Sequence, residues 1–376
     1  MTATSEPTGD LAASTSPATG DYRPPGRRVL RVGRVSWAWH PRGALVCAAL
    51  VGVLAVVFVR ALLSFDDYPM GTSDVLAVLL GGGDGGQRFV VFELRMPRAL
   101  TGALVGAALG LAGAILQSLA RNPLASPDTL GIGWGASVGA VAVIVLGGSA
   151  GGISGAVAQV GVPMGAAVGG LAAAVVVFGL SWRSGVQSNR LLLVGVATSL
   201  VCSNLVYWAL TWTDLQDAAR AQTWLTGSLH AADWDRVATA TVALAVLLPL
   251  SLGAARVVFA LGLGDDTARG LGVRVNGARL GLLVGAALLT CAATAAAGPI
   301  TFVALAAPQI ALRLCRTPQP PLLAATLLGG VLTLAADQVA AGLFAPTQLP
   351  VGIFTAILGA PFLMYLIVAR HREGRL

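Results

Sequence analysis

LGLGDDTARGLGVRVNG, residues 261–277, is a polar segment set between two apolar stretches of membrane-spanning length. Its charged side chains are Asp265, Asp266, Arg269 and Arg274. The pattern predicts a short helix over 267–271, because carboxylates are favoured at the positive N-terminal end of a helix. Leucines and Ala268 give this segment an apolar side. A short amphipathic helix between two spans either lies on the bilayer or docks into another protein.

The composition around this segment is that of a membrane protein. Of the 376 residues, 56% are hydrophobic and only 11% are charged, and the mean hydropathy is +0.78. These values exclude an ordinary soluble domain. The chain contains 48 glycines, many of them inside apolar runs, and small residues let membrane helices approach closely. The sequence therefore predicts an all-α polytopic membrane protein with about ten transmembrane helices in a compact bundle.

The hydropathy pattern divides the chain into three parts. Residues 1–42 are rich in Ser, Thr, Pro and Gly and are expected to be a disordered tail. Residues 43–369 hold the ten spans, with the polar loop at 260–279, and residues 370–376 form a short C-terminal tail. The expected spans are 44–63, 97–119, 130–147, 162–180, 190–210, 236–259, 280–298, 300–316, 321–344 and 350–369. A further short helix is expected over 73–80, between the first two spans.

The arginines indicate the orientation. All 24 basic residues are arginines. With ten spans, the arginines that fall on the outer side are Arg60, Arg88, Arg95, Arg98, Arg220 and Arg236, and all the others fall on the inner side. This bias predicts a multi-pass protein of the cell membrane with both termini and the loop 260–279 in the cytoplasm. The arginines flank apolar runs instead of sharing a face with aromatic residues, so nucleic acid is not an expected partner.

Catalytic and metal-binding patterns are missing from the sequence. The run GGGDGGQR at 81–88 resembles a phosphate loop, but a chain without lysine cannot supply the lysine of that motif. The four cysteines are isolated within apolar stretches, and no Cys/His cluster has metal-ligand spacing. We therefore expect no catalytic site, no metal site and no cofactor on this chain, and the transporter subunit, as opposed to an enzyme, is what the family resemblance described below implies. Any ATP and Mg²⁺ would be bound by a partner.

A few polar groups interrupt the apolar spans. Asp337 is the main ionisable one, and it is either the coupling site of an ion-coupled carrier or a structural aspartate hydrogen-bonded to neighbouring helices. Three proline-containing breaks, at 121–131, 295–302 and 306–313, free backbone groups that must be buried in protein or face water. The candidates for a translocation path or gate are Asn122, Pro123, Gly298, Pro299, Pro308, Gln309 and Asp337. Ordinary span ends and kinks would give the same pattern.

Arg95 and Arg98 stand at the outer entrance of the second span, on the side that is poor in arginine. Their side chains could extend to lipid head groups. They could instead pair with carboxylates of an external partner, because a guanidinium binds a carboxylate through two parallel hydrogen bonds.

Several long motifs in order resemble the FecCD-type permeases, the transmembrane subunits of ABC importers for iron–siderophores, haem and cobalamin. The resemblance covers about residues 95–366. It is carried by RMPRALTGALVGAALGLAGAILQSLARNPLASPDTLGIGWGASVGA at 95–140, AQTWLTGSL at 221–229, LGLGDDTARGLGV at 261–273, AGPITFVALAAPQIALR at 297–313 and LPVGIFTAILGAPFLMYLI at 349–367.

The resemblance implies a permease with ten spans. Its implied partners are a second permease subunit, two cytoplasmic ABC ATPases and an extracytoplasmic substrate-binding protein. It also implies that the loop holds the coupling helix that docks into the ATPase, at Gly264, Asp265, Asp266, Thr267, Ala268, Arg269, Gly270, Leu271 and Gly272. Arg95 and Arg98 match the arginines that meet the binding protein. Two departures are Gln309, where the family commonly has histidine, and Ala341, where it often has arginine. The implied cargo is an iron–siderophore or a similar metal chelate.

Overall fold

The computed structural model describes residues 28–32, 35–39, 41–63, 70–148, 160–182, 188–343 and 349–373. Within these residues, seven helices are long and apolar enough to cross a membrane, and three shorter apolar helices accompany them. Together they match the ten expected spans. The all-helical membrane fold predicted from the composition is therefore confirmed.

The helices follow one another with short connections. They are α1 (Pro41–Leu62), α2 (Thr72–Leu79), α3 (Gly85–Phe89), the π-helical segment η1 (Val90–Arg95), α4 (Met96–Ala120), α5 (Ile132–Gly148), α6 (Val162–Ser181), α7 (Ser188–Leu210), α8 (Leu215–Leu225), α9 (Trp234–Gly253), α10 (Ala255–Leu263), α11 (Asp265–Gly270), α12 (Val275–Ala297), α13 (Val303–Cys315), α14 (Leu322–Leu343) and α15 (Val351–Glu373).

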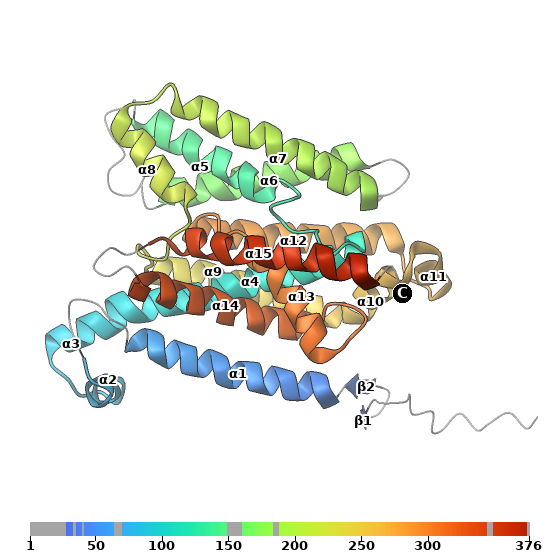
Figure 1. Cartoon of the computed structure of the whole chain (residues 1–376), viewed down its shortest axis with the longest axis horizontal. Coiled ribbons are helices and arrows are strands. Elements are labelled where there is room, and N and C mark those ends of the chain that lie inside the picture. Colours follow the sequence, from blue (N-terminus) through green and yellow to red (C-terminus); the bar gives the residue numbers. More distant parts are fainter. Residues whose placement is uncertain are drawn as a thin grey trace, which may run out of the picture.

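The long helices run side by side, and the short helices lie at the two ends of the bundle (Figure 1). One end carries α2, α3 and α8. The other end carries α11 together with the last turn of α15 and the chain segment that leads into α1. The loop of α11, the start of α1 and the end of α15 are therefore on one side of the bundle; that this side is cytoplasmic stays a prediction from the arginine pattern.

Helix α4 lies at the centre of the larger group of helices. It packs against α9, α12, α13 and α14, and most of its side chains are buried. The contacts are close because glycines replace larger residues: a Cβ at Gly106 or Gly110 would overlap backbone atoms of α14. Small residues of this kind allow the backbones of membrane helices to touch.

Helices α5 and α6 form a second close pair, at the edge nearest α7 and α8 (Figure 1). Gly135 and Gly139 on α5 face Gly165 and Gly169 on α6, and a Cβ at any of the four would overlap the opposite helix. A separate small core of alanine, valine and isoleucine side chains fills the space around this pair. The glycine-rich composition thus has a specific packing role at two helix crossings.

Three segments differ from the expectations. The tail 1–42 was expected to be without regular structure, but Arg28–Val32 (β1) and Val35–Trp39 (β2) form a short antiparallel hairpin. The span expected at 236–259 ends at Gly253 and the chain turns before α10 begins, because Pro249 removes a helical hydrogen bond and glycine weakens the last turn. The helix expected at 267–271 begins earlier, at Asp265.

The outer helix expected over 73–80 is present as α2. Its first turn is closed by a hydrogen bond of 2.9 Å from the backbone N–H of Gly71 to the carboxylate of Asp74. A carboxylate in the first turn is also favourable toward the helix dipole.

Candidate functional site

The polar loop folds around two glycines that bound α11. Gly264 and Gly272 have φ values of +123° and +80°, which residues with a side chain rarely adopt. Between them, α11 is six residues long and lies at an angle to α10 and α12, the helices that enter and leave the loop (Figure 1). The two glycines let α11 take an orientation independent of the spans on either side.

One side of α11 is anchored in the bundle and the other is exposed. Ala268 is fully buried against the bundle. Leu263 and Leu271 are more than half exposed, and the side chain of Asp266 is 99% exposed. Leu263, at the end of α10, and Leu271, just after α11, thus form an exposed apolar pair beside charged groups. Such a surface is a candidate for protein docking.

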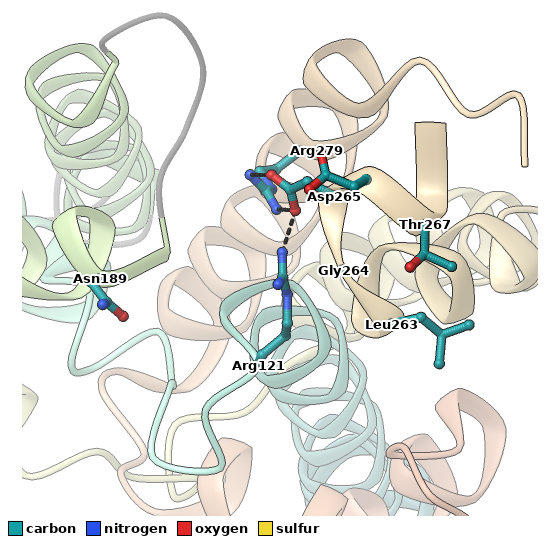
Figure 2. A pocket seen from close by; sticks show the side chains of 8 residues that line it. Arg121, Asn189, Leu263, Gly264, Asp265, Thr267 and Arg279 are labelled. Atoms are coloured by element: carbon teal, nitrogen blue, oxygen red, sulfur yellow. Dashed lines mark hydrogen bonds and ion pairs between the residues drawn. The ribbon is translucent and has the colours of Figure 1, made fainter. Parts of the chain in front are cut away.

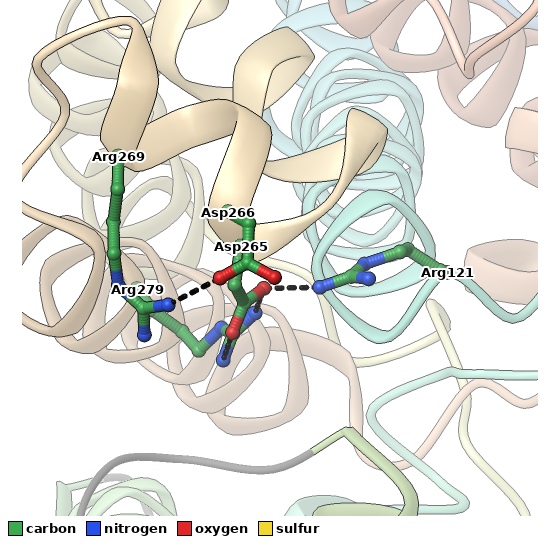
Figure 3. Close-up of polar contacts among 5 residues, drawn as sticks. All are labelled: Arg121, Asp265, Asp266, Arg269 and Arg279. Atoms are coloured by element: carbon green, nitrogen blue, oxygen red, sulfur yellow. Dashed lines mark hydrogen bonds and ion pairs between the residues drawn. The ribbon is translucent and has the colours of Figure 1, made fainter.

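Asp265 ties α11 to two long helices (Figure 3). Its carboxylate accepts hydrogen bonds of 2.8 and 3.3 Å from the guanidinium of Arg279, which lies on the first turns of α12 and is 3% exposed. The same carboxylate also pairs with Arg121, the residue that ends α4. One carboxylate therefore joins α4, α11 and α12.

The charges around Asp265 determine its ionisation. Partial burial raises the pKa of this carboxyl, but the hydrogen bonds from Arg279 and the positive charges of Arg279, Arg121 and Arg269 outweigh that effect, and the pKa lies below its ordinary value. The carboxylate is therefore charged throughout the physiological pH range.

We expect the anchoring of α11 to be independent of pH between about pH 5 and pH 8. A carboxyl with a lowered pKa stabilises the folded state above its unfolded pKa, and this stabilisation is lost only as the pH falls through the lower, folded value. Amide hydrogen exchange of residues 265–272, corrected for intrinsic rates, measures the anchoring. Asp265→Asn should exchange faster at every pH. A rise in the exchange of the unmodified protein near pH 6 would contradict this assignment.

The other ion pair of the loop is local. Arg269 donates to Asp266 at 2.8 Å, three residues away on the same short helix, and both side chains are mostly exposed. This pair shapes α11 but connects it to nothing else. Exposed pairs of this type contribute about 0–1 kcal/mol to stability.

A cavity of about 600 Å³ opens beside α11 (Figure 2). Its lining residues are Arg121, Asn189, Leu263, Gly264, Asp265, Asp266, Thr267 and Arg279. Figure 2 shows Asn189, from the start of α7, across the open space from Arg121 and α11. Three of these residues were not predicted to belong to this site. Arg121 and Asn189 are distant along the chain from the motif at 261–273, and Arg279 follows the motif.

The outer arginines are turned into the bundle. Arg95 is 3% exposed and donates to the carbonyl oxygen of Leu62 at 3.0 Å. Arg98 makes two hydrogen bonds to Asp337, at 2.9 and 3.0 Å, with side-chain exposures of 19% and 6%. Both guanidiniums therefore hold partners within the bundle, and their contact with lipid head groups or with an external partner stays a prediction. The structural interpretation of Asp337, hydrogen-bonded to a neighbouring helix, is the one that fits.

The remaining path candidates fall into separate places. Gln309 donates to the side chain of Gln117 at 2.7 Å, and Gln117 donates to the carbonyl oxygen of Leu305 at 3.1 Å, so α13 is bound to α4 on either side of Pro308. Asn122 accepts from the backbone N–H of Leu124, which closes the turn that contains Pro123.

Gly298 and Pro299 lie elsewhere, at the end of the bundle that carries α8. A Cβ on Gly227 or Gly352 would contact the carbonyl oxygen of Pro299. The loop after α8, the loop after α12 and the start of α15 therefore meet there. The structure therefore does not gather the path candidates into a single site within this chain. Their role in a path or gate stays a prediction.

Comparison with known proteins gives a consistent result. A model of the FecCD transport family matches residues 48–369. The ferric enterobactin transport system permease protein FepG of Escherichia coli K12 is 38% identical over 329 residues, which are 88% of this chain and 97% of FepG. The iron(3+)-hydroxamate import system permease protein FhuG of Bacillus subtilis is 35% identical over 326 residues, 86% of this chain and 97% of FhuG.

A solved structure has the same fold. It is a metal-chelate type ABC transporter in an inward-facing conformation, with a TM-score of 0.75 and 26% identity over 87% of this chain and 99% of that one.

Proposed function

This chain belongs to the FecCD transport family, and from that membership we propose that it is the permease subunit of an ABC importer for a ferric siderophore or a similar metal chelate. The proposed partners are a second permease subunit, two cytoplasmic ABC ATPases and an extracytoplasmic binding protein. The metal crosses inside its chelate, so the permease needs no metal ligands of its own. ATP and Mg²⁺ are bound by the ATPases, and this chain hydrolyses nothing.

The observation that carries this proposal is the arrangement of α11. It stands at the arginine-rich end of the bundle, bounded by two glycines of positive φ, with exposed leucines outward and Asp265 fastened inward. A helix that only rested on lipid would not need an ion-pair anchor to two spans. A helix that is pushed by an ATPase does, because force passes to the bundle only through a fixed contact.

The cavity beside α11 supports the same function. It is about 600 Å³ in volume and is lined by charged and polar side chains of α11, α4 and α7. A docking partner can therefore insert side chains between α11 and the neighbouring spans, and can move α11 relative to α7.

The binding protein is proposed as a partner, but the contacts are not assigned to Arg95 and Arg98. Both guanidiniums already hold partners within this chain, Arg98 through two hydrogen bonds to Asp337. To bind the binding protein, each guanidinium would have to leave its partner in this chain for a group of the binding protein.

We expect transport to require ATP hydrolysis by the partner subunits. The assembled importer is placed in proteoliposomes with ATP inside, and uptake of a ⁵⁵Fe-labelled chelate is measured with the loaded binding protein outside. Uptake should fall to background without ATP and should persist when proton and sodium gradients are collapsed, because ATP hydrolysis is the proposed energy source and Asp337, the candidate coupling carboxylate, is held by Arg98. Uptake that is driven by an ion gradient in the absence of ATP would refute the proposal.

A further inference from the structure

We infer that Asp265, acting through Arg121, is the residue of α11 that transmits its movement to helix α4. This inference rests on the proposed function, because it concerns how an ATPase at α11 would act on the bundle. It distinguishes the residue that carries the movement from those that only shape the helix. Asp265 and Arg121 are treated as positioning residues, because their contacts hold helices relative to one another.

The first support is which helices each ion pair of α11 connects. The pair of Asp266 and Arg269 lies wholly within α11 and moves with it. The pair of Asp265 and Arg279 joins α11 to α12, which already follows it in the chain. Arg121 is 144 residues away from Asp265, on a helix that the chain does not otherwise connect to α11. This pair is therefore a direct contact between α11 and α4, in addition to the packing of α4 against α10 and α12.

The second support is the backbone of Arg121. This residue ends α4 in the left-handed conformation, with φ +50° and ψ +33°. Helices that end this way usually carry glycine there, because a Cβ is strained in that region. An arginine accepts this strain here, and its guanidinium reaches Asp265 (Figure 3). Strained residues of this kind are often tied to function.

The third support is what α4 can do with a displacement. It is a 25-residue helix that continues without a break from α3 and η1 at the opposite end of the bundle. Near that end, Arg98 fixes α4 to α14 through Asp337. A movement applied at Arg121 is therefore carried along a stiff, buried helix to the outer face, where α4 is again held by an ion pair.

The test uses a pair of matched glycine variants. Arg121→Gly removes the guanidinium and at the same time suits the left-handed backbone. Arg316 ends α13 in the same conformation, with φ +50°, at the end of the bundle that carries α10 and α11. Gln319, three residues further on, donates to the carbonyl oxygen of Phe259 on α10 at 3.0 Å, which places Arg316 near this loop. Arg316→Gly is thus the control for the backbone change.

Each variant is studied in the complete importer in lipid nanodiscs. The readout is the ratio of ATP hydrolysis with and without the loaded binding protein, together with the thermal unfolding of the purified complex. We expect Arg121→Gly to lower this ratio about five- to tenfold while unfolding stays at the unmodified temperature, which a purely structural role would not produce. Arg316→Gly should keep the ratio of the unmodified complex, and Arg121→Lys should recover part of it by restoring the charge.

The outcomes are distinct. An unchanged ratio in Arg121→Gly overturns the inference, and so does an equal loss in both glycine variants, which would mean that any change at this end has the same effect. A failure of the proposed function appears differently, as an unmodified chain that assembles with no ATPase or shows no stimulation.

Discussion

Asp337→Ala is expected to remove most of the folded protein from the membrane, with a loss of stability of about 3–5 kcal/mol. The change leaves the guanidinium of Arg98 without its two hydrogen bonds at 2.9 and 3.0 Å, at a place where only 19% of that side chain is exposed. Removing one partner of a buried charge pair costs far more than the pair itself contributes. The measurement is the monodisperse fraction after detergent extraction, followed by thermal unfolding.

A charge swap tests the same pair from the other direction. Arg98→Asp with Asp337→Arg restores opposite charges on α4 and α14, and should recover much of the stability that either single change removes. Arg269→Ala is the control, because it breaks an exposed ion pair of 2.8 Å and should cost about 0–1 kcal/mol. If Arg98→Asp or Asp337→Arg alone were as stable as the unmodified protein, the ion pair would not hold α4 against α14.

The swap also separates the two transport mechanisms that the sequence left open. An ion-coupled carrier that uses Asp337 would lose uptake in the swapped variant even when it is folded, since the carboxylate has moved to another helix. An importer driven by ATPases should retain uptake, because the pair is needed only to hold α4 against α14.

Gly113→Ala is expected to have the second largest effect, a loss of about 3 kcal/mol, at the upper end of what overpacking costs. A Cβ at Gly113 would overlap the backbone carbonyl of Ala304, at the start of α13. Backbone atoms cannot move aside as a flexible side chain can. The first turn of α13 must therefore shift away from α4, and the hydrogen bond from Gln117 to Leu305 is lost with it.

Gly285→Ala is the matched control for this prediction. Gly285 lies in the middle of α12, and a Cβ there would meet nothing within 4 Å. Alanine favours a helix over glycine by about 1 kcal/mol, so this variant should be at least as stable as the unmodified protein. The two variants are compared by thermal unfolding in the same detergent. Equal unfolding temperatures would show that the crossing of α4 and α13 is looser than the structure indicates.

The sequence by itself determined the features that depend on local composition. Each span must be apolar along its own length because lipid offers its backbone no hydrogen bonds, and the hydropathy pattern therefore predicted all ten spans. The outer helix α2 and the polar segment around α11 were also predictable from local composition, because each is a short helical pattern between two apolar spans. The family resemblance, which the comparisons confirm, added the expected function of that segment.

Only the tertiary structure decided which charges meet. Arg98 and Asp337 are 239 residues apart, and Arg121 and Asp265 are 144 residues apart. The sequence placed Arg98 at an outer surface and left Asp337 without a partner, and the fold joins them because the glycines of α4 bring α14 into backbone contact. The free energy of a charge in a membrane protein depends on its nearest opposite charge, and that neighbour is set by helix packing and not by position along the chain.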